Sequence, residues 1–469
     1  MSESSKAAAV KEVSLYFIPV EMRVPLKFGN QVLTSVTCAR ARVVLEGTDG
    51  RTAEGWGETP LSVGWVWPSP VDYELRHEAM KDFTIQIARS LDSYRKEGHP
   101  LELGHDFASV RLEKLQTAFN EDSSEDEELP HLAALVCFSP FDIAIHDAYG
   151  RLHGLPVYET YNSAFMTHDL SAYLDSPEDN VSFEGVFPAA YLKEEPDLEL
   201  PVWHLVGGLD PLDESELTGD EPDDGYPVVL TDWIREDGLD CLKVKLRGND
   251  AEWDYARLGK IGAICRDQDV TWLTTDFNCT VTDPAYVNDI LDRLKIEDPV
   301  TYQKILYVEQ PFPYDLVTHR IDVHSVSARK PLFMDESAHD WSYVKMGRAL
   351  GWTGVALKTC KTQTGALLSL CWAKAHGMTL MVQDLTNPML AQIPHFLLAA
   401  YADTIMGVES NGMQFYPEAS APEREIHPGL FRRKEGKLDG STLSGNGFGY
   451  RLDEISRELP EPVHTTPGS

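Results

Sequence analysis

The chain has 469 residues, of which 42% are hydrophobic and 25% are charged, a composition that supports a large core beneath an ordinary surface. This length exceeds one small domain and fits one large barrel together with a second domain. Acidic residues outnumber basic ones by 75 to 41, and the net charge of −34 disfavours nucleic acid and anionic membranes as partners. A solvated acidic surface is the simplest explanation of that charge.

The cysteines and the N-terminus indicate a cytoplasmic protein. The seven cysteines are scattered, form no Cys-x-x-Cys pair, and several fall inside apolar runs, so we expect reduced thiols rather than disulfides. Residues 1–13 contain no apolar signal core. No segment approaches the ~18 uninterrupted apolar residues of a transmembrane helix.

The first third of the chain predicts an α+β domain. Residues 12–60 predict antiparallel strands, because 35–47 alternates between apolar and polar residues and a Gly-Thr-Asp-Gly turn follows. Residues 71–117 predict helices with spaced apolar positions, and 120–130 predicts an acidic surface loop. A strong helical pattern then covers 131–159, where Gly-Leu-Pro ends the helix.

The remainder predicts a parallel sheet. Weak periodicity and many acidic residues predict an insertion near 160–227, around a first barrel strand at 201–206. Strand-like runs then begin at intervals typical of βα units, near 241, 271, 306, 331, 354, 378 and 404. After 412 the chain becomes rich in Pro and Gly, and 445–454 predicts a final strand that returns to the N-terminal domain.

Five of these apolar runs each end in charged or amide residues. They are CLKVKL (241–246), WLTTDFN (272–278), LYVEQP (306–311), PLFMDES (331–337) and GVALKT (354–359). Active sites of (β/α)₈ barrels lie at the C-terminal ends of the strands, and several strands contribute to them. The ordered set therefore predicts a metal site flanked by lysines that act as acid and base.

The lysines are the candidate proton-transfer groups. Lys243 and Lys245 are two residues apart and share one face of a strand. Each is expected to lower the pKa of the other, and burial to lower it further, which suits a general base. The alternative for this pair alone is the solvated face of an amphipathic strand. Lys358 ends the sixth strand and is expected to flank the metal from the opposite side of the mouth.

Three single carboxylates, Asp276, Glu309 and Asp335, end three successive strands. Each would be costly if buried without a partner, and a hard cation such as Mg²⁺, with Mn²⁺ as an alternative, removes that cost. Asn278 and Glu336 are close enough in sequence to support this site or to add ligands. The alternative is that the three carboxylates have separate ion-pair or capping roles.

This arrangement permits proton removal from one face of a substrate carbon and proton return to the other face. The metal would hold the substrate carboxylate and stabilise an enediolate. A lysine base combined with Mg²⁺ and an ene-diolate is the pattern of the enolase superfamily.

From about 20 to 455 the chain resembles the mandelate racemase/muconate lactonizing enzyme family of that superfamily, closest to its muconate-lactonizing/dipeptide-epimerase branch. The resemblance rests on the helix at 141–159, on LKVKLRG for the Lys-x-Lys strand and on TTDFN for the Asp-x-Asn strand. It rests equally on YVEQPFP, FMDES and ALKTCKTQTGA for the next three strands.

The resemblance implies a modified, enolase-like (β/α)₈-type TIM barrel at 141–429. An N-terminal α+β capping domain at 1–140 would be completed by a C-terminal segment at about 430–469. The resemblance implies that Lys245 is the acid or base nearest the substrate, Lys243 its modulator and Lys358 the opposite acid or base. It also implies a small carboxylate substrate and a homo-oligomer.

In this family two capping-domain loops cover the mouth, and they match 24–30 and 61–70 here. The two tryptophans of the second loop would form a lid, and packing at the domain interface is the alternative. The expected substrate-binding set is Lys27, Trp65, Trp67, Asn278, Glu336, Gln383, Asp384, Glu409 and Asn411. The seventh-strand segment, 381–388, lacks the His that mandelate-racemase-like relatives carry, and the acidic pair of dipeptide epimerases is matched only loosely by Glu409 and Asn411.

Three functions are compatible with these residues. The first is an Mg²⁺-dependent isomerase that racemises, epimerises or cycloisomerises a small carboxylic acid. The second is a dehydratase of acid sugars that uses the same first step. The third is a non-catalytic protein that keeps the fold for binding or for structural purposes.

Overall fold

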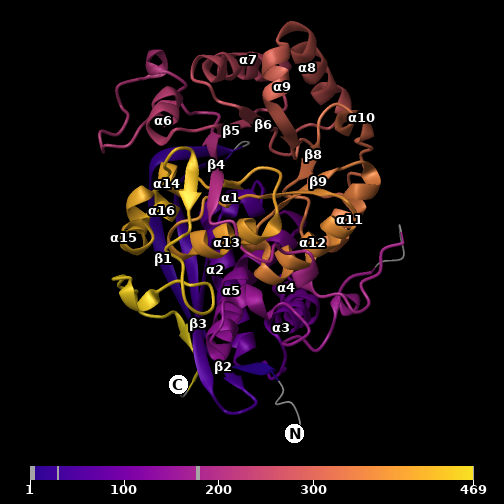
Figure 1. The fold of residues 1–469 in the computed structure, drawn as a ribbon, viewed down its shortest axis with the longest axis vertical. Helices are drawn as coiled ribbons and strands as arrows, with labels where there is room; N and C mark the ends of the chain where they lie inside the picture. Colours follow the sequence, from indigo (N-terminus) through magenta and orange to yellow (C-terminus); the bar gives the residue numbers. More distant parts are fainter. Residues whose placement is uncertain (1–5, 29–30, 176–179, 468–469) are drawn as a thin grey trace.

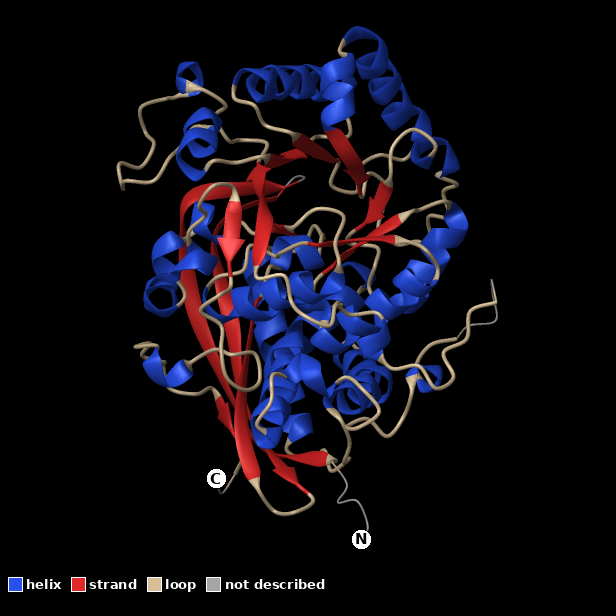
Figure 2. Cartoon of the chain, viewed as in Figure 1, coloured by secondary structure: helices blue, strands red, loops and turns tan. Residues whose placement is uncertain are grey.

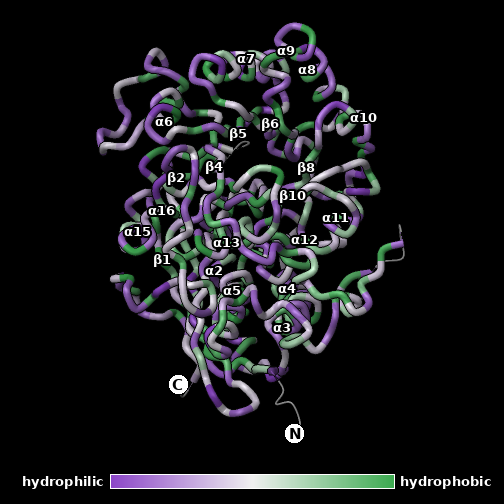
Figure 3. The backbone as a smooth tube through the Cα atoms, viewed as in Figure 1, coloured by the Kyte–Doolittle hydropathy of each residue, from purple (hydrophilic) through white to green (hydrophobic). Residues whose placement is uncertain are grey.

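The computed structural model describes residues 6–28, 31–175 and 180–467. Two sheets organise the chain: an antiparallel sheet built mainly from the N-terminus, and a curled parallel sheet that forms the barrel (Figures 1 and 2). The hydropathy of the chain follows this plan, with apolar segments gathered in the interior and hydrophilic ones in the outer loops (Figure 3).

The antiparallel sheet contains β1 (Ala8–Phe28), β2 (Gln31–Gly47) and β3 (Thr52–Pro60), which confirms the strands predicted for 12–60. The long helix α5 (His131–His153) packs across β2 and β3. Glycines permit this close approach, since a Cβ on Gly55 would lie 2.1 Å from the backbone nitrogen of Ala148. By length and composition α5 is apolar enough to cross a membrane, but its apolar window is entirely buried inside the molecule.

Further helices complete the capping domain and confirm the helical character of 71–117. They are α1 (Val63–Val66), α2 (Tyr73–Leu91), α3 (Pro100–Asp106), the π-helix η1 (Phe107–Leu112) and α4 (Glu113–Phe119). The predicted end of the long helix is also confirmed, because Gly154 caps α5 in the left-handed conformation with φ 71°.

The parallel sheet has the order β10-β9-β8-β7-β6-β5-β4-β11, so consecutive strands are neighbours except at β11. The strands are β4 (Glu199–Val206), β5 (Cys241–Lys245), β6 (Trp272–Asp276), β7 (Ile305–Glu309), β8 (Leu332–Met334), β9 (Gly354–Leu357), β10 (Thr379–Val382) and β11 (Val408–Glu409). Each predicted strand is present, although the last begins at Val408 rather than near 404.

Helices line the outside of this sheet. They are α6 (Leu230–Asp237), α7 (Ala251–Asp267), α8 (Pro284–Glu297), α9 (Pro299–Lys304), α10 (His324–Ser327), α11 (Trp341–Leu350), α12 (Gln363–Ala375) and α13 (Gln392–Ala402). Three short helices follow β11, namely α14 (Gly412–Phe415), α15 (Ala421–Ile426) and α16 (Pro428–Phe431).

Strand alternation places the site inside the barrel. The lower interior is filled by an apolar cluster of Trp203, Cys241, Tyr307, Phe333 and Met381. Successive side chains on a strand point to opposite faces, so the residues two positions further along each strand also point inward. Those residues, toward the C-terminal ends, are Leu205, Lys243, Glu309, Asp335 and Gln383.

The C-terminal segment differs from the prediction. Residues 445–454 form turns and the short helix η10 (Leu452–Glu454) instead of a strand, because three glycines there, at 445, 447 and 449, have positive φ. The return to the N-terminal sheet is made later, by β13 (His464–Thr465) against β1. An additional strand, β12 (Lys437–Asp439), pairs with the start of β4.

The predicted insertion is largely irregular. Residues 161–198 contain only single-turn helices in their described part, and residues 176–179 lie outside the described residues. The second part is a loop at 207–229 that carries the helical turn η6 (Glu214–Glu216) and extends beside α6, at the upper left of Figure 1.

Candidate active site

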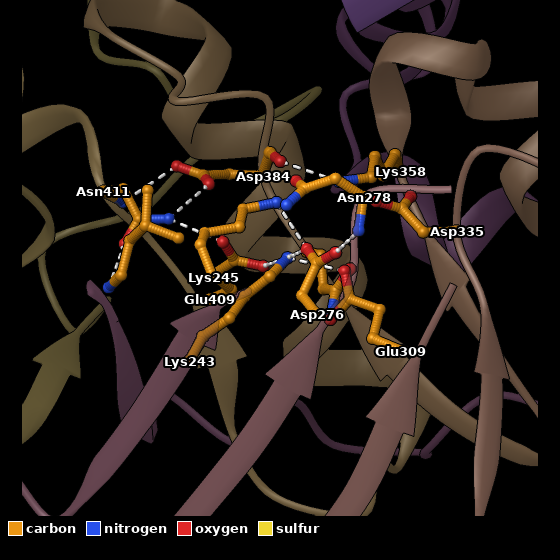
Figure 4. Close-up of polar contacts among 12 residues, drawn as sticks. Lys243, Lys245, Asp276, Asn278, Glu309, Asp335, Lys358, Asp384, Glu409 and Asn411 are labelled. Atoms are coloured by element: carbon orange, nitrogen blue, oxygen red, sulfur yellow. Dashed lines mark hydrogen bonds and ion pairs between the residues drawn. The ribbon is translucent and has the colours of Figure 1, made fainter. Parts of the chain in front are cut away.

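Lys243 lies at the centre of a buried charge cluster at the C-terminal ends of the strands (Figure 4). Its Nζ donates to Glu309 Oε1 at 2.6 Å and to Glu409 Oε2 at 3.0 Å, and lies 3.4 Å from Asp276 Oδ2. Burial lowers the pKa of Lys243, but these three carboxylates raise it well above the usual lysine value. The expectation of a lowered pKa for Lys243 is therefore wrong, since the acidic neighbours outweigh the adjacent lysine.

Lys245 extends beyond Lys243 on the same face of β5. Its Nζ donates to Asp276 Oδ2, and its side chain remains 11% exposed. The other oxygen of Asp276 accepts from the backbone nitrogen of Asn278 at 2.9 Å. Burial raises the pKa of Asp276, but the two lysines lower it well below its usual range. Asp276 is therefore an ionised carboxylate that holds Lys245 in position.

The opposite side of the mouth carries Lys358. Its Nζ lies 3.2 Å from Asp335 Oδ2 and donates to the carbonyl oxygen of Asp384 at 2.9 Å. Burial lowers the pKa of Lys358, but Asp335 raises it, and the net pKa lies above the usual lysine value. Sequence reasoning missed Lys361, which lies 3.6 Å from Asp335 Oδ1; its signal is its position three residues after Lys358 in the same short turn.

The two lysines assigned to proton transfer meet at one cavity. It has a volume of about 50 Å³, and its charged walls are formed by Lys243, Lys245, Asp335, Lys358, Asp384 and Glu409. Its other walls are Leu26, Ser62, Trp65, Leu205, Leu385, Thr386 and Asn411. Apart from Trp65 and Asn411, none of these was predicted as a site residue, because aliphatic and hydroxyl side chains carry no chemical signal in the sequence.

The carboxylates fit a divalent cation in their chemistry. Buried Asp335 Oδ1 and Glu336 Oε2 have no hydrogen-bond partner, although Lys361 lies 3.6 Å from Asp335 Oδ1, and carboxylate oxygens are the donors that Mg²⁺ prefers. Burial and the neighbouring acids Asp276 and Asp335 raise the pKa of Glu309 well above its usual value, although Lys243 opposes this shift. Among the described residues no three acidic, His or Cys side chains converge on a common metal position, because the lysines lie between the carboxylates.

The predicted residues that follow the last two strands form hydrogen bonds with the charge cluster. Gln383 donates to Glu309 Oε2 at 2.6 Å. Asn411 donates to Glu409 Oε1 at 2.6 Å and to Asp384 Oδ1 at 3.1 Å. The bond from Asn411 holds Glu409, the partner of Lys243. Glu409, Asp384 and Asn411 all line the cavity.

Five of the predicted substrate contacts do not line the cavity: Gln383 and Glu336, which contact other residues of the site, and the three that follow. The Asn278 amide donates to the carbonyl oxygen of Leu246 at 2.9 Å, and Asn278 does not line the cavity. Lys27 is half-buried on β1 beside Leu26, which does line it, while residues 29–30 of the predicted loop lie outside the described residues. Trp67 is only 3% exposed and packs in the core of the capping domain.

Trp65 is the tryptophan that reaches the site. Its Nε1 donates to Glu336 Oε1 at 2.9 Å, and Lys358 Nζ lies 5.1 Å from the centroid of the indole ring. Trp65 therefore joins the capping domain to both the acidic pair after β8 and the lysine after β9. Trp67 therefore packs in the core of the capping domain and Trp65 lines the cavity, while a lid formed by these tryptophans stays a prediction.

Comparisons with known proteins agree with this architecture. Residues 229–456 match the family described as enolase C-terminal domain-like. A muconate lactonizing enzyme from Mycobacterium smegmatis, complexed with muconolactone, has 15% identity and a TM-score of 0.60 over 94% of this chain and 96% of that chain. An N-succinyl Arg/Lys racemase from Bacillus cereus has 16% identity and a TM-score of 0.59 over 97% and 99% of the two chains.

A dipeptide epimerase from Cytophaga hutchinsonii, complexed with Mg and the dipeptide D-Ala-L-Val, has 17% identity and a TM-score of 0.56 over 87% of this chain and 88% of that chain. No curated protein sequence matches this chain. The solved structures share the fold over nearly their whole length, and the family match covers the strands that carry the charge cluster. Residues 229–456 therefore match the enolase C-terminal domain-like family, and the chain has the fold of mandelate racemase/muconate lactonizing enzyme members of the enolase superfamily.

Proposed function

We propose that this protein is an Mg²⁺-dependent isomerase that removes the proton alpha to the carboxylate of a small acid. Return of a proton gives racemisation or epimerisation, and internal attack gives cycloisomerisation. One observation carries the proposal: Lys245, on β5, and Lys358, after β9, line the same small cavity together with buried carboxylates. The similarity to racemases, an epimerase and a muconate lactonizing enzyme supports the same type of reaction.

The metal would be held by Asp276, Glu309 and Asp335, whose buried oxygens supply the hard donors that Mg²⁺ requires. When bound, it would supply the positive charge that stabilises an enediolate. Lys243 bridges Glu309, Glu409 and Asp276 and, with its raised pKa, remains a fixed cation that orients these three side chains.

The two remaining lysines divide the proton transfer. Lys358 has a raised pKa, so its Nζ carries a proton that it can deliver to one face of the α-carbon. Lys245 is more exposed and Asp276 positions it, which suits its Nζ to take the proton from the other face. In the reaction the α-carbon would give its proton to the neutral Nζ of Lys245 and receive a proton from the Nζ of Lys358, across one cavity.

The apolar walls serve to exclude water. Leu26, Leu205, Leu385 and Trp65 close the cavity on the sides that carry no acid or base. A dry site strengthens the electrostatic interactions between the lysines and a developing enediolate. We also propose that the protein is a cytoplasmic homo-oligomer and that its partner is a small carboxylate rather than nucleic acid or membrane.

A deuterium-exchange screen tests the proposal. The protein is incubated with Mg²⁺ and a panel of carboxylic acids in D₂O, and proton NMR follows the α-hydrogen of each acid. Exchange without loss of water supports the isomerase, and loss of water would instead identify a dehydratase. If no acid exchanges, the chain is a non-catalytic relative. Lys437→Ala is a control lysine variant that should keep the exchange activity, because the exposed side chain of Lys437 pairs with Glu199 at the far end of β4.

A further inference from the structure

A second cavity lies on the outer face of β4, against the barrel wall. It has a volume of about 730 Å³, within the range of ~300–1,000 Å³ for sites that bind small molecules. His204 and Val206 of β4 line it, whereas the intervening Leu205 lines the active-site cavity, and the two cavities share no lining residue. The predicted insertion forms much of its wall, through residues 208–222, and α6, α7, residues 23–25 of β1 and residues 414–415 of α14 add to it.

His204 adds a buried, neutral imidazole to the wall of this cavity. The side chain is only 2% exposed, and burial lowers its pKa well below the usual value, so the ring is neutral. Arg433 donates to Nδ1, and the single ring proton must therefore lie on Nε2. The nearest polar atom to Nε2 is the amide nitrogen of Gln414 at 3.4 Å, which is itself a donor to the carbonyl of Leu205.

Two guanidinium groups approach one indole ring on the opposite wall. Arg247 lies 4.0 Å and Arg257 lies 5.7 Å from the ring centroid of Trp253. The Nη2 of Arg257 donates to the carbonyl oxygens of Gly207 and Asp210, but its buried Nε has no partner. The wall therefore presents two cationic groups, of which Arg247 is half exposed.

Acidic side chains at this cavity limit which ligands it can bind. Asp210 accepts from the nitrogen of Gly207 at 2.7 Å, and Glu216 accepts from Lys260 at 2.6 Å, so both have partners already. Asp220 and Glu221 line the loop side, where Glu221 accepts from Thr218. Their charge disfavours polyanions such as nucleotides, whereas a single carboxylate can pair with the arginines across the cavity.

We propose that the outer cavity binds a monocarboxylate with an apolar, aromatic-sized body. The carboxylate pairs with the guanidinium of Arg247, which is half exposed and lies with Arg257 against the ring of Trp253. The apolar body contacts Trp233, Phe415 and Pro25, which line the same cavity. A single carboxylate at this wall offsets the charge of the two guanidinium groups.

Photoaffinity labelling of the Mg²⁺-loaded protein locates the site. The probe is para-(trifluoromethyldiazirinyl)benzoate, and peptide mapping identifies where it reacts. We expect labelled peptides from 204–233 and 247–257, with competition by benzoate but not by neutral benzamide. Labelling confined to the mouth segments 61–67 and 384–386, or equal competition by benzamide, would overturn the proposal.

Two arginine variants separate the proposed site from general charge effects. Arg247→Gln should reduce labelling about tenfold or more, because a hydrogen bond to a charged group is lost. Arg247 is half exposed, and its ion pair with Asp250 at 3.4 Å is a surface contact, so this variant should keep the fold. Arg293→Gln is the matched control, since Arg293 also stacks on an aromatic ring, Tyr255, but lies outside the cavity. Equal labelling of the two variants would refute the assignment.

Discussion

Trp65 and Trp67 are two residues apart, yet the structure gives them different roles. Trp65→Ala should impair the reaction, because it removes the hydrogen bond to Glu336 and the aromatic ring beside Lys358. Trp67→Ala should impair stability, because Trp67 is 3% exposed within the core of the capping domain. The two variants therefore distinguish, within a single loop, the effect of losing a contact with the site from the effect of losing core packing.

The expected magnitudes follow from these contacts. Truncating a buried Trp to Ala typically costs ~3–5 kcal/mol of unfolding free energy, and we expect this loss for Trp67→Ala. Trp65→Ala removes a hydrogen bond to an acidic group, worth ~1.5–3 kcal/mol, and so should lower kcat/KM about tenfold to a hundredfold. Trp65→Phe keeps a ring near Lys358 but loses the indole N–H, so it isolates the contribution of the hydrogen bond to Glu336.

Two assays on the same samples distinguish the roles. Urea unfolding gives the stability, and α-proton exchange on the acid identified by the NMR screen gives kcat/KM. We expect Trp65→Ala to lose activity with little loss of stability, and folded Trp67→Ala to keep normal kinetics. A folded Trp67 variant with tenfold lower kcat/KM, or a Trp65 variant with unaltered kinetics, would refute this reasoning.

Three further outcomes are expected. Lys245→Ala and Lys358→Ala should each lower turnover by ~10²–10⁴-fold or more, with unchanged circular dichroism, because neither can replace the other as acid or base. Chelation by EDTA should stop α-proton exchange and added Mg²⁺ should restore it, while Asp276→Asn should weaken Mg²⁺ binding at least about tenfold in calorimetry. Burial raises the pKa of Asp142 from 3.8 to about 7, so the folded state binds its proton more tightly. This contribution to the free energy of unfolding is complete below the unfolded pKa and is lost as pH rises through about 7. In urea unfolding, the stability of Asp142→Asn should therefore depend less on pH than that of the unmodified protein between the unfolded pKa and about 7.

The barrel and its charged ring could be predicted from sequence because two independent patterns coincide there. Short apolar runs at regular intervals indicate parallel strands, and a charged residue at the end of each run has few structural explanations. The alternation of strand residues then places Lys243, Glu309 and Asp335 on the inner face. Each of these inferences uses residues that are neighbours in the sequence or occupy equivalent positions on adjacent strands.

The features that sequence missed depend on distant residues. The pKa of Lys243 is raised partly by Glu409, which is 166 positions away, and the local pair with Lys245 gave the opposite expectation. The strand at 445–454 was mispredicted because alternation alone does not reveal that its glycines adopt positive φ. Burial of Trp67 depends on how α1 packs in the capping domain, which the loop composition does not indicate.

The active-site cavity is divided into a reactive and an apolar side, and this division follows the order of the strands. The adjacent strands β5, β6 and β7 carry Lys245, which lines the cavity, and Asp276 and Glu309, which hold Lys245 and Lys243. The next two strands lead into Asp335 and Lys358 at the cavity wall. At the equivalent layer β4 contributes Leu205, which faces the cavity beside Leu26. A substrate bound with its carboxylate toward the acidic strands must therefore place its remaining atoms toward β4. In the proposed reaction the strands β5–β9 perform the proton transfer, and the wall formed by β4 and the capping domain selects the substrate.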